Sequence, residues 1–246
     1  MRDYTNLGWP EAPFGADQRP FGLPSDMLAA FAVEWAEQPE GGPVPVGVAT
    51  VYLRVRRHGP AQPVDPRALS IGFRATVIEN TTEVPELLAL ADRALTRSRR
   101  HARIVAGHRL DGDLSRIAGL CTVPLRGVAG VRTGWANRET RERGMALMVD
   151  TDVEARPLAA HLDVPLDPLP VPLPDTPTCC AAVAQTVLTR GLAIGLTAAV
   201  YAGRYQWEGT FPLSDVIDRE AWDILGQERQ DHAAGGPPRA PGRGGD

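Results

Sequence analysis

The chain has 246 residues, 43% of them hydrophobic and 23% charged, so it is long enough to bury a full core and too apolar for wholesale disorder. The formal net charge is −4, which argues against a general polyanion binder and leaves only a local basic patch to contact nucleic acid. All 26 basic residues are arginines, and the lack of lysine excludes P-loop, Schiff-base and kinase-type lysine chemistry.

The sequence gives no sign of a membrane or secreted protein. No run approaches the roughly 18 to 20 apolar residues of a membrane span. The N-terminal stretch MRDYTNLGWPEAPFG lacks the basic flank and apolar segment of a secretory signal. We therefore expect a cytoplasmic protein with no membrane partner. The cysteines, Cys121, Cys179 and Cys180, lack the paired CxxC units of a zinc site, so we expect buried free thiols.

The first part of the chain predicts strands after an irregular start. Residues 1–26 are rich in proline, glycine and aromatic side chains, and we expect an irregular N-terminal arm. Residues 26–36 (DMLAAFAVEWA) fit a helix or a strand, because periodicity does not distinguish the two in a short apolar run. Residues 44–57 and 68–79 are rich in β-branched residues and follow turns, which predicts two strands. Three successive strands with short turns would form an antiparallel meander.

A helix is predicted next, with Thr82 as its N-cap and Pro85 in its first turn. Its apolar stripe consists of Leu87, Leu88, Ala91, Ala94 and Leu95. An arginine cluster closes the helix, where cations complement the helix dipole. The members of this cluster are Arg97, Arg99, Arg100 and Arg103.

The second half of the chain predicts strands and helices in alternation. ARIVAGH predicts a strand, DLSRIAGL a short helix, and TRERGMALMVDT a helix that runs into a strand ending at Asp150. Residues 164–177 contain a proline at every second to third position, and these prolines exclude regular structure. Residues 179–205 are alanine-rich and nearly all apolar, which predicts one or two buried helices. The tail from residue 226 has the composition of a disordered segment.

This order of elements predicts an α/β protein with a mixed sheet and helices on both faces, as in ribonuclease H-like folds. We expect residues 27–225 to form this domain, between the arm of residues 1–26 and a disordered tail of residues 226–246.

The stretch IVAGHRLDGDLSRI (104–117) contains the polar residues that suggest a site. An apolar strand ends at His108, and Asp111 and Asp113 follow directly. One interpretation is a metal-dependent active site at the mouth of the sheet. The simpler interpretation is that Asp111 caps the next helix, because aspartate is a favoured N-cap residue.

The order of elements and this stretch resemble the DEDD-type 3′–5′ exonucleases. GHRLDGD has the shape of that family's second motif, AHNxxFD, and follows a helix (ELLALADRAL) like the one that precedes the motif. The resemblance places Asp113 at the metal-binding aspartate. FAVEWAEQPEGG would carry the first motif, DxE, with Glu34 at its glutamate. MALMVDT, which includes Asp150, resembles a later strand of the family. LTRGLAIGLTAAVYA (188–202) has the spacing of the last motif, HRALxDAxAT.

The departures from this family are located at the groups that do the chemistry. The first aspartate corresponds to Ala32, the last aspartate to Ile194, and the general-base histidine to Thr189. Two magnesium ions roughly 4 Å apart need clustered carboxylates to hold them, and magnesium prefers oxygen ligands. Loss of the base removes about another 10² to 10⁴ in rate. The resemblance thus implies a catalytically degenerate domain that acts as a nucleic-acid or protein binding or regulatory module, with no cofactor expected.

Two alternatives remain open. The first is an active exonuclease in which redistributed ligands hold Mg²⁺ or Mn²⁺. The second is an unrelated α/β protein that binds a small molecule. The first alternative uses Glu34, Asp113 and Asp150 as metal ligands, with Asp111 and His108 as further catalytic candidates. Three of these residues also have a structural explanation. Asp111 would be a helix cap or a surface acid, His108 a packed core histidine, and Glu34 a residue on a helix surface.

Nucleic-acid binding has one further candidate in the sequence. No acidic residue interrupts the cluster Arg97, Arg99, Arg100 and Arg103, so this cluster is a candidate phosphate contact. The arginines of residues 126–144 alternate with Glu139 and Glu142, which favours a self-paired helix face. The glycines in that stretch are spaced GxxGxxxG and do not match a dinucleotide fingerprint. The expected partner is single-stranded nucleic acid or a protein, and no pattern indicates an oligomeric state.

Overall fold

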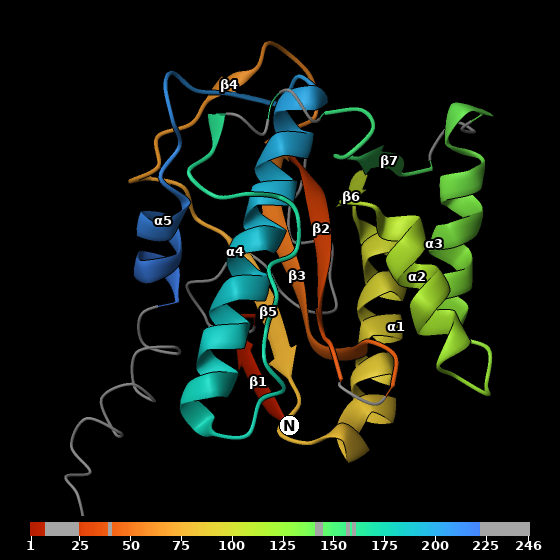
Figure 1. The fold of residues 1–246 in the computed structure, drawn as a ribbon. Coiled ribbons are helices and arrows are strands. Elements are labelled where there is room, and N and C mark those ends of the chain that lie inside the picture. Colours follow the sequence, from red (N-terminus) through yellow and green to blue (C-terminus); the bar gives the residue numbers. More distant parts are fainter. Residues whose placement is uncertain (8–24, 39–40, 141–144, 156–157, 159–160, 222–246) are drawn as a thin grey trace, which may run out of the picture.

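The computed structural model describes residues 1–7, 25–38, 41–140, 145–155, 158 and 161–221. A six-stranded mixed sheet forms the middle layer of the protein, with helices on both faces (Figure 1). The described strands are β1 (Arg2–Thr5), β2 (Ser25–Ala36), β3 (Val44–Arg56), β4 (Gln62–Pro63), β5 (Gly72–Val77), β6 (Ile104–Gly107), β7 (Leu147–Asp150) and β8 (Tyr205–Gln206). The described helices are α1 (Val84–His101), α2 (Leu110–Gly119), α3 (Arg126–Ala136), α4 (Pro177–Tyr201) and α5 (Leu213–Glu220), with short 3₁₀ turns η1 (Thr81–Glu83) and η2 (Arg138–Thr140).

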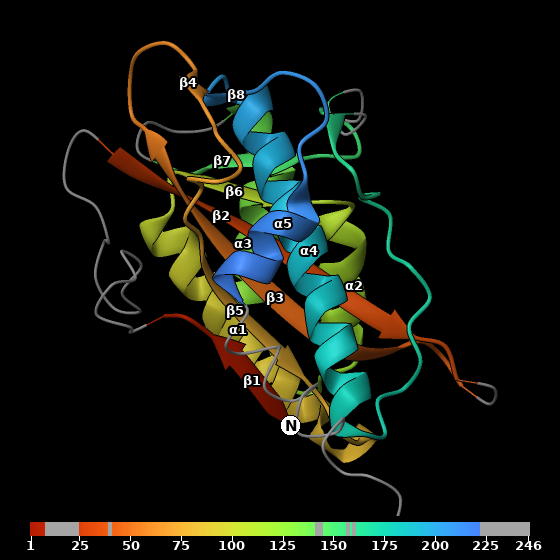
Figure 2. The same cartoon turned by 90° about the vertical axis from the view of Figure 1, so that its left-hand side faces the viewer.

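The strand order of the main sheet is β1-β5-β3-β2-β6-β7. Strands β2, β3 and β5 form the expected antiparallel meander, and β6 and β7 run parallel to β2. Helix α4 packs on β2, β3 and β5 from one side, with α5 against it, while α1 packs on the other side together with α3 (Figure 2). The prediction of an α/β protein with a mixed sheet and helices on both faces is confirmed at this level.

The ambiguous stretch at residues 26–36 is the strand β2, in the centre of the sheet. It pairs with β3 along its whole length and with β6 on its other side, and every residue from Asp26 to Ala36 is buried. A central strand that is buried on both faces has apolar residues on both, so it lacks the alternation that identifies a half-exposed strand. This burial explains why the sequence did not separate strand from helix here, and it puts Glu34 in the interior.

Helix α4 lies close to the sheet because its inner face is made of small residues. A Cβ added at Gly191 would lie 3.1 Å from Val51, and one added at Gly195 would lie 3.1 Å from Leu53. By length and composition α4 is apolar enough to cross a membrane, but 72% of its most apolar window is buried inside the protein. The expectation of buried helix in this region is confirmed, as a single helix.

Two local predictions at the start of the chain and of α1 are wrong in detail. Strand β1 lies within the stretch expected to be an irregular arm, and it extends the sheet by pairing with β5, whereas residues 8–24 lie outside the described part. Thr82 is not the N-cap of α1. It belongs to η1, where the side chain of Asn80 accepts a hydrogen bond from the Thr82 N–H, and asparagine is a strong N-cap residue. Pro85 does lie in the first turn of α1.

Other expectations are confirmed in part. Strand β7 ends at Asp150 as predicted, while the residues 141–144 of the helix expected before it lie outside the described part. The proline-punctuated segment contains no helix or strand between residue 164 and the start of α4. All three cysteines are free thiols, but only Cys180 is buried. The tail expected from residue 226 lies outside the described residues.

We predict that Gly127→Ala destabilises the fold by about 1–3 kcal/mol, because overpacking at a tight contact forces the backbone to shift. Helices α1 and α3 approach so closely that a Cβ at Gly127 would lie 2.1 Å from the carbonyl oxygen of Asp92. Gly112→Ala in α2 is the control, since a Cβ there meets nothing within 4 Å, and we expect it to stabilise by about 0.5–1 kcal/mol. Urea unfolding measures both, and equal effects would contradict the packing argument.

Candidate functional site

Glu34 and Arg190 form an ion pair in the interior, between the sheet and α4. The Arg190 Nε lies 2.8 Å from the Glu34 Oε1, and the two side chains are 6% and 0% exposed. The Arg190 guanidinium also donates a hydrogen bond to the carbonyl oxygen of Val33. Glu34 points to the same face of β2 as Ala32, whose Cβ lies near Gly191 of α4. The charged pair thus lies inside an otherwise apolar interface.

The contact between Glu34 and Arg190 is close but is not aligned as a hydrogen bond. Both carboxylate oxygens of Glu34 therefore lack a hydrogen-bond partner among the described residues. Buried polar atoms without a partner are rare in folded proteins, and those that exist concentrate at functional or strained positions.

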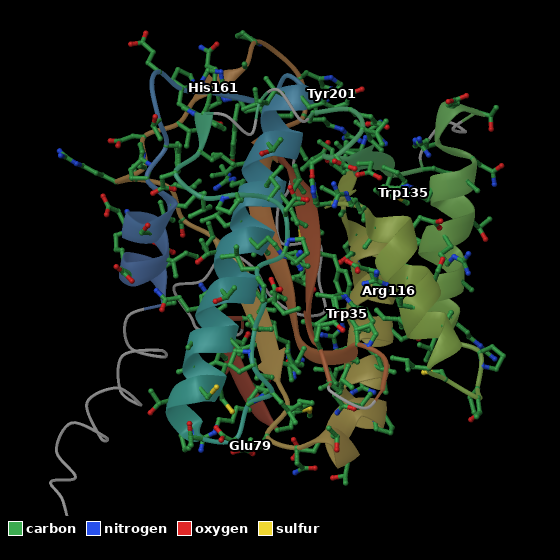
Figure 3. All side chains as sticks on the ribbon, viewed as in Figure 1. Trp35, Glu79, Arg116, Trp135, His161 and Tyr201 are labelled. Atoms are coloured by element: carbon green, nitrogen blue, oxygen red, sulfur yellow. The ribbon has the colours of Figure 1, made fainter. Side chains whose placement is uncertain are left out.

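Asp113 joins this pair from the first turns of α2. The Trp35 Nε1 donates a hydrogen bond of 2.9 Å to the Asp113 Oδ1. The register between β2 and β3 shifts between Glu34 and Trp35, and such an irregularity changes the direction in which the next side chain points. The Arg116 guanidinium lies over the Trp35 ring, 5.6 Å from its centroid. Figure 3 labels both residues, which lie on the side of the sheet where α2 packs.

The positive charge of Arg190 acts on both Glu34 and Asp113. Burial raises the pKa of the Glu34 carboxyl to about 7, with Arg190 opposing this rise and Asp113 adding to it. Burial also raises the pKa of Asp113, against the opposing effects of Arg190, the Trp35 hydrogen bond and Arg116. Burial is thus the main cause of both shifts, and the positive charge of Arg190 opposes them without cancelling them.

His108 belongs to a second cluster, at the ends of β6 and β7. Its Nδ1 lies 3.0 Å from the Thr151 Oγ1 and its Nε2 lies 3.3 Å from the Asp167 Oδ1. Burial lowers the pKa of His108, and Asp167 opposes this shift. Asp167 lies in the segment 161–176, which runs alongside α4 (Figures 1 and 2). The histidine is buried, and it contacts this segment at the ends of the strands.

Asp150 stabilises the turn beside His108. Its Oδ1 accepts hydrogen bonds of 3.1 Å from the backbone N–H groups of Arg109 and Asp152. Arg109 is the N-cap residue of α2 with a φ of 53°, a left-handed conformation that is uncommon outside glycine. Its Nε donates to Asp152 at 2.9 Å and its Nη1 lies 3.0 Å from Asp167. Through these contacts Asp150 and its neighbours stabilise the turn.

The structure brings together two of the predicted metal ligands, Glu34 and Asp113. Asp150 and His108 contact a different set of residues, at the ends of β6 and β7. Asp111 is exposed on α2 and lies 3.4 Å from Arg132, so it is a surface acid; its predicted role as N-cap is wrong, because Arg109 occupies that position. Within the described residues, no group of three or more His, Cys, Asp or Glu side chains is placed to hold a metal ion.

The arginines at the end of α1 do not share one surface. Arg97 lines a pocket beside Tyr52, whereas the guanidinium of Arg99 occupies the space next to Gly130 of α3. Residues two positions apart on a helix point about 200° away from each other, which explains the divergence. Arg100 is exposed in the last turn, and Arg103 lies beyond the helix, with its backbone N–H bonded to Met27. A single phosphate-binding cluster of these four residues is therefore not formed.

Arg190 is not among the predicted site residues, although it lies in the last motif between Thr189 and Ile194. A signal was present, because Arg190 is the only charged residue in the 25 residues of α4. A charged side chain in a buried apolar helix requires a partner, since charged residues are almost never fully buried unless paired. The same reasoning would have paired it with a carboxylate but would not have identified which one.

Comparison of the chain with protein-family models, with curated proteins and with solved structures finds no match. We therefore infer its function from the strand order and from the side chains around Glu34.

We predict that Arg190→Met destabilises the protein by about 3–5 kcal/mol, because it leaves the Glu34 carboxylate buried without its counter-charge. The double variant Glu34→Leu/Arg190→Met should lose much less stability or gain some, since an apolar pair of similar volume avoids the desolvation of both charges. Urea unfolding at pH 8 in a double-mutant cycle measures the coupling.

The matched control for this cycle is Arg132→Met, which removes an exposed arginine and should change stability by no more than about 0.5 kcal/mol. Additive losses from Glu34→Leu and Arg190→Met would show that the two side chains are not coupled.

We predict that part of the folding stability falls as the pH rises from about 4.5 to about 7. The pKa of Glu34 increases from an ordinary 4.5 to about 7 on folding, so the folded state binds more protons than the unfolded state in this range. The contribution is fully present below pH 4.5 and is lost as the pH rises through the folded value. Unfolding curves across this range should show that the stability of the wild type falls with rising pH and that the stability of Glu34→Gln does not show this fall. Identical pH profiles for the two proteins would rule out a raised pKa at this residue.

Proposed function

We propose that this chain is a ribonuclease H-like domain, related in architecture to the DEDD-type 3′–5′ exonucleases, that binds its ligand without hydrolysing it. The strand order supports the fold assignment. Without the edge strand β1, the sheet reads β5-β3-β2-β6-β7, in which only β3 runs opposite to the others. Numbered along the chain, this is the order 3-2-1-4-5 with an antiparallel second strand, the arrangement typical of ribonuclease H-like folds.

Apolar side chains at two of the four metal-ligand positions carry the loss of hydrolysis. The resemblance places Glu34 and Asp113 at metal-ligand positions, and it places Ala32 and Ile194 where the family has its other two carboxylates. Ala32 is 2% exposed and Ile194 is 1% exposed, and neither side chain has an oxygen that could bind a metal ion. Arg190 matches the arginine of the family's last motif, and it contacts Glu34. The residues present therefore do not fit a two-metal centre, and we derive no hydrolytic step through one.

The Arg190 guanidinium does not replace what a metal pair supplies. Its Nε lies 2.8 Å from the Glu34 Oε1. It does not lower the pKa of a bound water or stabilise the attacking and leaving oxygens of a displacement. The domain would thus keep the shape of the site without the groups that activate water.

Single-stranded nucleic acid is the ligand class that the resemblance implies. A protein ligand is the second candidate, and an observation on the segment 161–176 favours it. Leu169 and Leu173 are 54% and 39% exposed there, between prolines that exclude helix and central strand. Exposed apolar side chains on an extended, proline-rich segment are suited to a partner's groove.

We predict that the full chain does not shorten an end-labelled single-stranded oligonucleotide in Mg²⁺ or Mn²⁺ beyond a buffer control. Titration calorimetry should likewise give no saturable binding of either ion, because apolar Ala32 and Ile194 occupy two of the four ligand positions that the resemblance implies. Fluorescence anisotropy without added metal tests nucleic-acid binding, whose strength should fall with salt.

Asp113→Asn and Asp111→Asn form the matched pair for this experiment, since the two residues lie on the same helix and only Asp113 contacts Trp35. Cleavage that Asp113→Asn abolishes and Asp111→Asn leaves intact would establish the active-exonuclease alternative and refute the proposal.

A further inference from the structure

A proline-rich segment crosses the edge of the sheet at which Glu34 lies. The strands β2, β6 and β7 run parallel, so their carboxyl ends form one edge. Glu34 lies near the end of β2, and His108 directly follows β6. In open α/β sheets, ligands bind in the crevice outside such strand ends. The segment of residues 161–176 crosses this edge, because its Asp167 contacts His108.

The register of the sheet places His108 close to Glu34. Ala30, which faces α4, pairs with Ala106, so two further residues along each strand bring Ala32 level with His108. Side chains two positions apart on a strand share a face, and each step of two residues spans about 7 Å. His108 therefore lies on the same face of the sheet as Glu34, about one such step away from it along the strands.

Both ends of the segment are fixed to the rest of the protein. Leu162 and Leu166 are 8% and 5% exposed, and Asp163 accepts a hydrogen bond of 3.0 Å from the N–H of Leu213 at the start of α5. At the other end, Pro174 is buried just before α4. In Figure 1 the segment descends along α4, on the side of α2.

The middle of the segment is held mainly by charge. The Asp167 carboxylate lies 3.0 Å from the Arg109 Nη1 and 3.3 Å from the His108 Nε2, and its side chain is 59% exposed. Val171 packs partly against the core, whereas the other residues from 168 to 173 are exposed. Ion pairs with exposed members contribute little net stability and are screened by salt. The middle can therefore leave the crevice while both ends stay fixed.

We propose that residues 161–176 form a strap that controls access to the crevice beside Glu34. In the closed state, Asp167 ties the middle of the strap to His108 and Arg109. In the open state, the middle moves away between its fixed ends and uncovers the crevice. The prolines keep the strap extended in both states, because each fixes its own φ. The role as a gate rests on the ligand binding proposed above, whereas the opening of the strap does not.

Modification by diethyl pyrocarbonate, located by mass spectrometry, measures the opening in the full chain. The reagent attacks an uncovered imidazole nitrogen, so His108 reacts when the strap is open, and the exposed His161 is the internal reference. Asp167→Asn keeps the size of the side chain and removes its charge, and we expect the rate at His108 to rise about threefold to tenfold. Asp175→Asn, which removes an exposed acid of the same segment, should leave this rate unchanged.

Arg109→Gln separates the opening from a local effect on the imidazole. It removes one charged contact of the strap and leaves the contact between Asp167 and His108 in place, so the rate at His108 should rise here too. High salt should also raise the rate in the wild type, and raise it less in Asp167→Asn. Circular dichroism checks the fold of each variant. Equal rates in the wild type and in both variants, or an equal rise in Asp175→Asn, would overturn the strap.

Anisotropy with a labelled single-stranded oligonucleotide tests the gate separately. Asp167→Asn should bind about threefold or more tighter than Asp175→Asn, which has lost the same charge from the same segment. Equal binding by these two variants would overturn the gate. An increased rate at His108 with no oligonucleotide binding by any of the proteins would instead support the strap and refute nucleic-acid binding as the function.

Discussion

The ion pair of Glu34 and Arg190 constrains how helix α4 packs on the sheet. Taking two charges out of water carries a desolvation penalty that their attraction offsets only when they meet closely. Glu34 lies in the central strand and Arg190 in α4, so a packing that separated them would leave two buried charges without a counter-charge. The small residues at Gly191 and Gly195 let the helix approach, but small residues do little to fix its position along the strands.

The same pair lies near the second carboxylate of the candidate site. Burial raises the pKa of both Glu34 and Asp113, and the positive charge of Arg190 opposes both shifts. Trp35 of β2 donates a hydrogen bond to Asp113 of α2, and the guanidinium of Arg116, also in α2, lies over the Trp35 ring.

The two faces of the sheet differ in polarity because successive side chains of β3 point to opposite faces. Its Ala49 and Val51 give α4 a dry surface, and its Thr50 and Tyr52 give the α1 side a polar one. An apolar helix with a single buried charge suits the first face, and a helix with arginines along one side suits the second.

The sequence by itself determined the local elements whose patterns are strong: the helix with its apolar stripe at 87–95, the strand ending at Asp150 and the buried alanine-rich helix. It also indicated, through a resemblance, that Glu34 and Asp113 belong to one site. Only the tertiary structure showed that residues 25–36 are a central strand, because a strand buried on both faces has no alternation to reveal it. Only the tertiary structure placed Arg190 against Glu34, because a contact between distant residues depends on how helix and sheet pack, which no local pattern specifies.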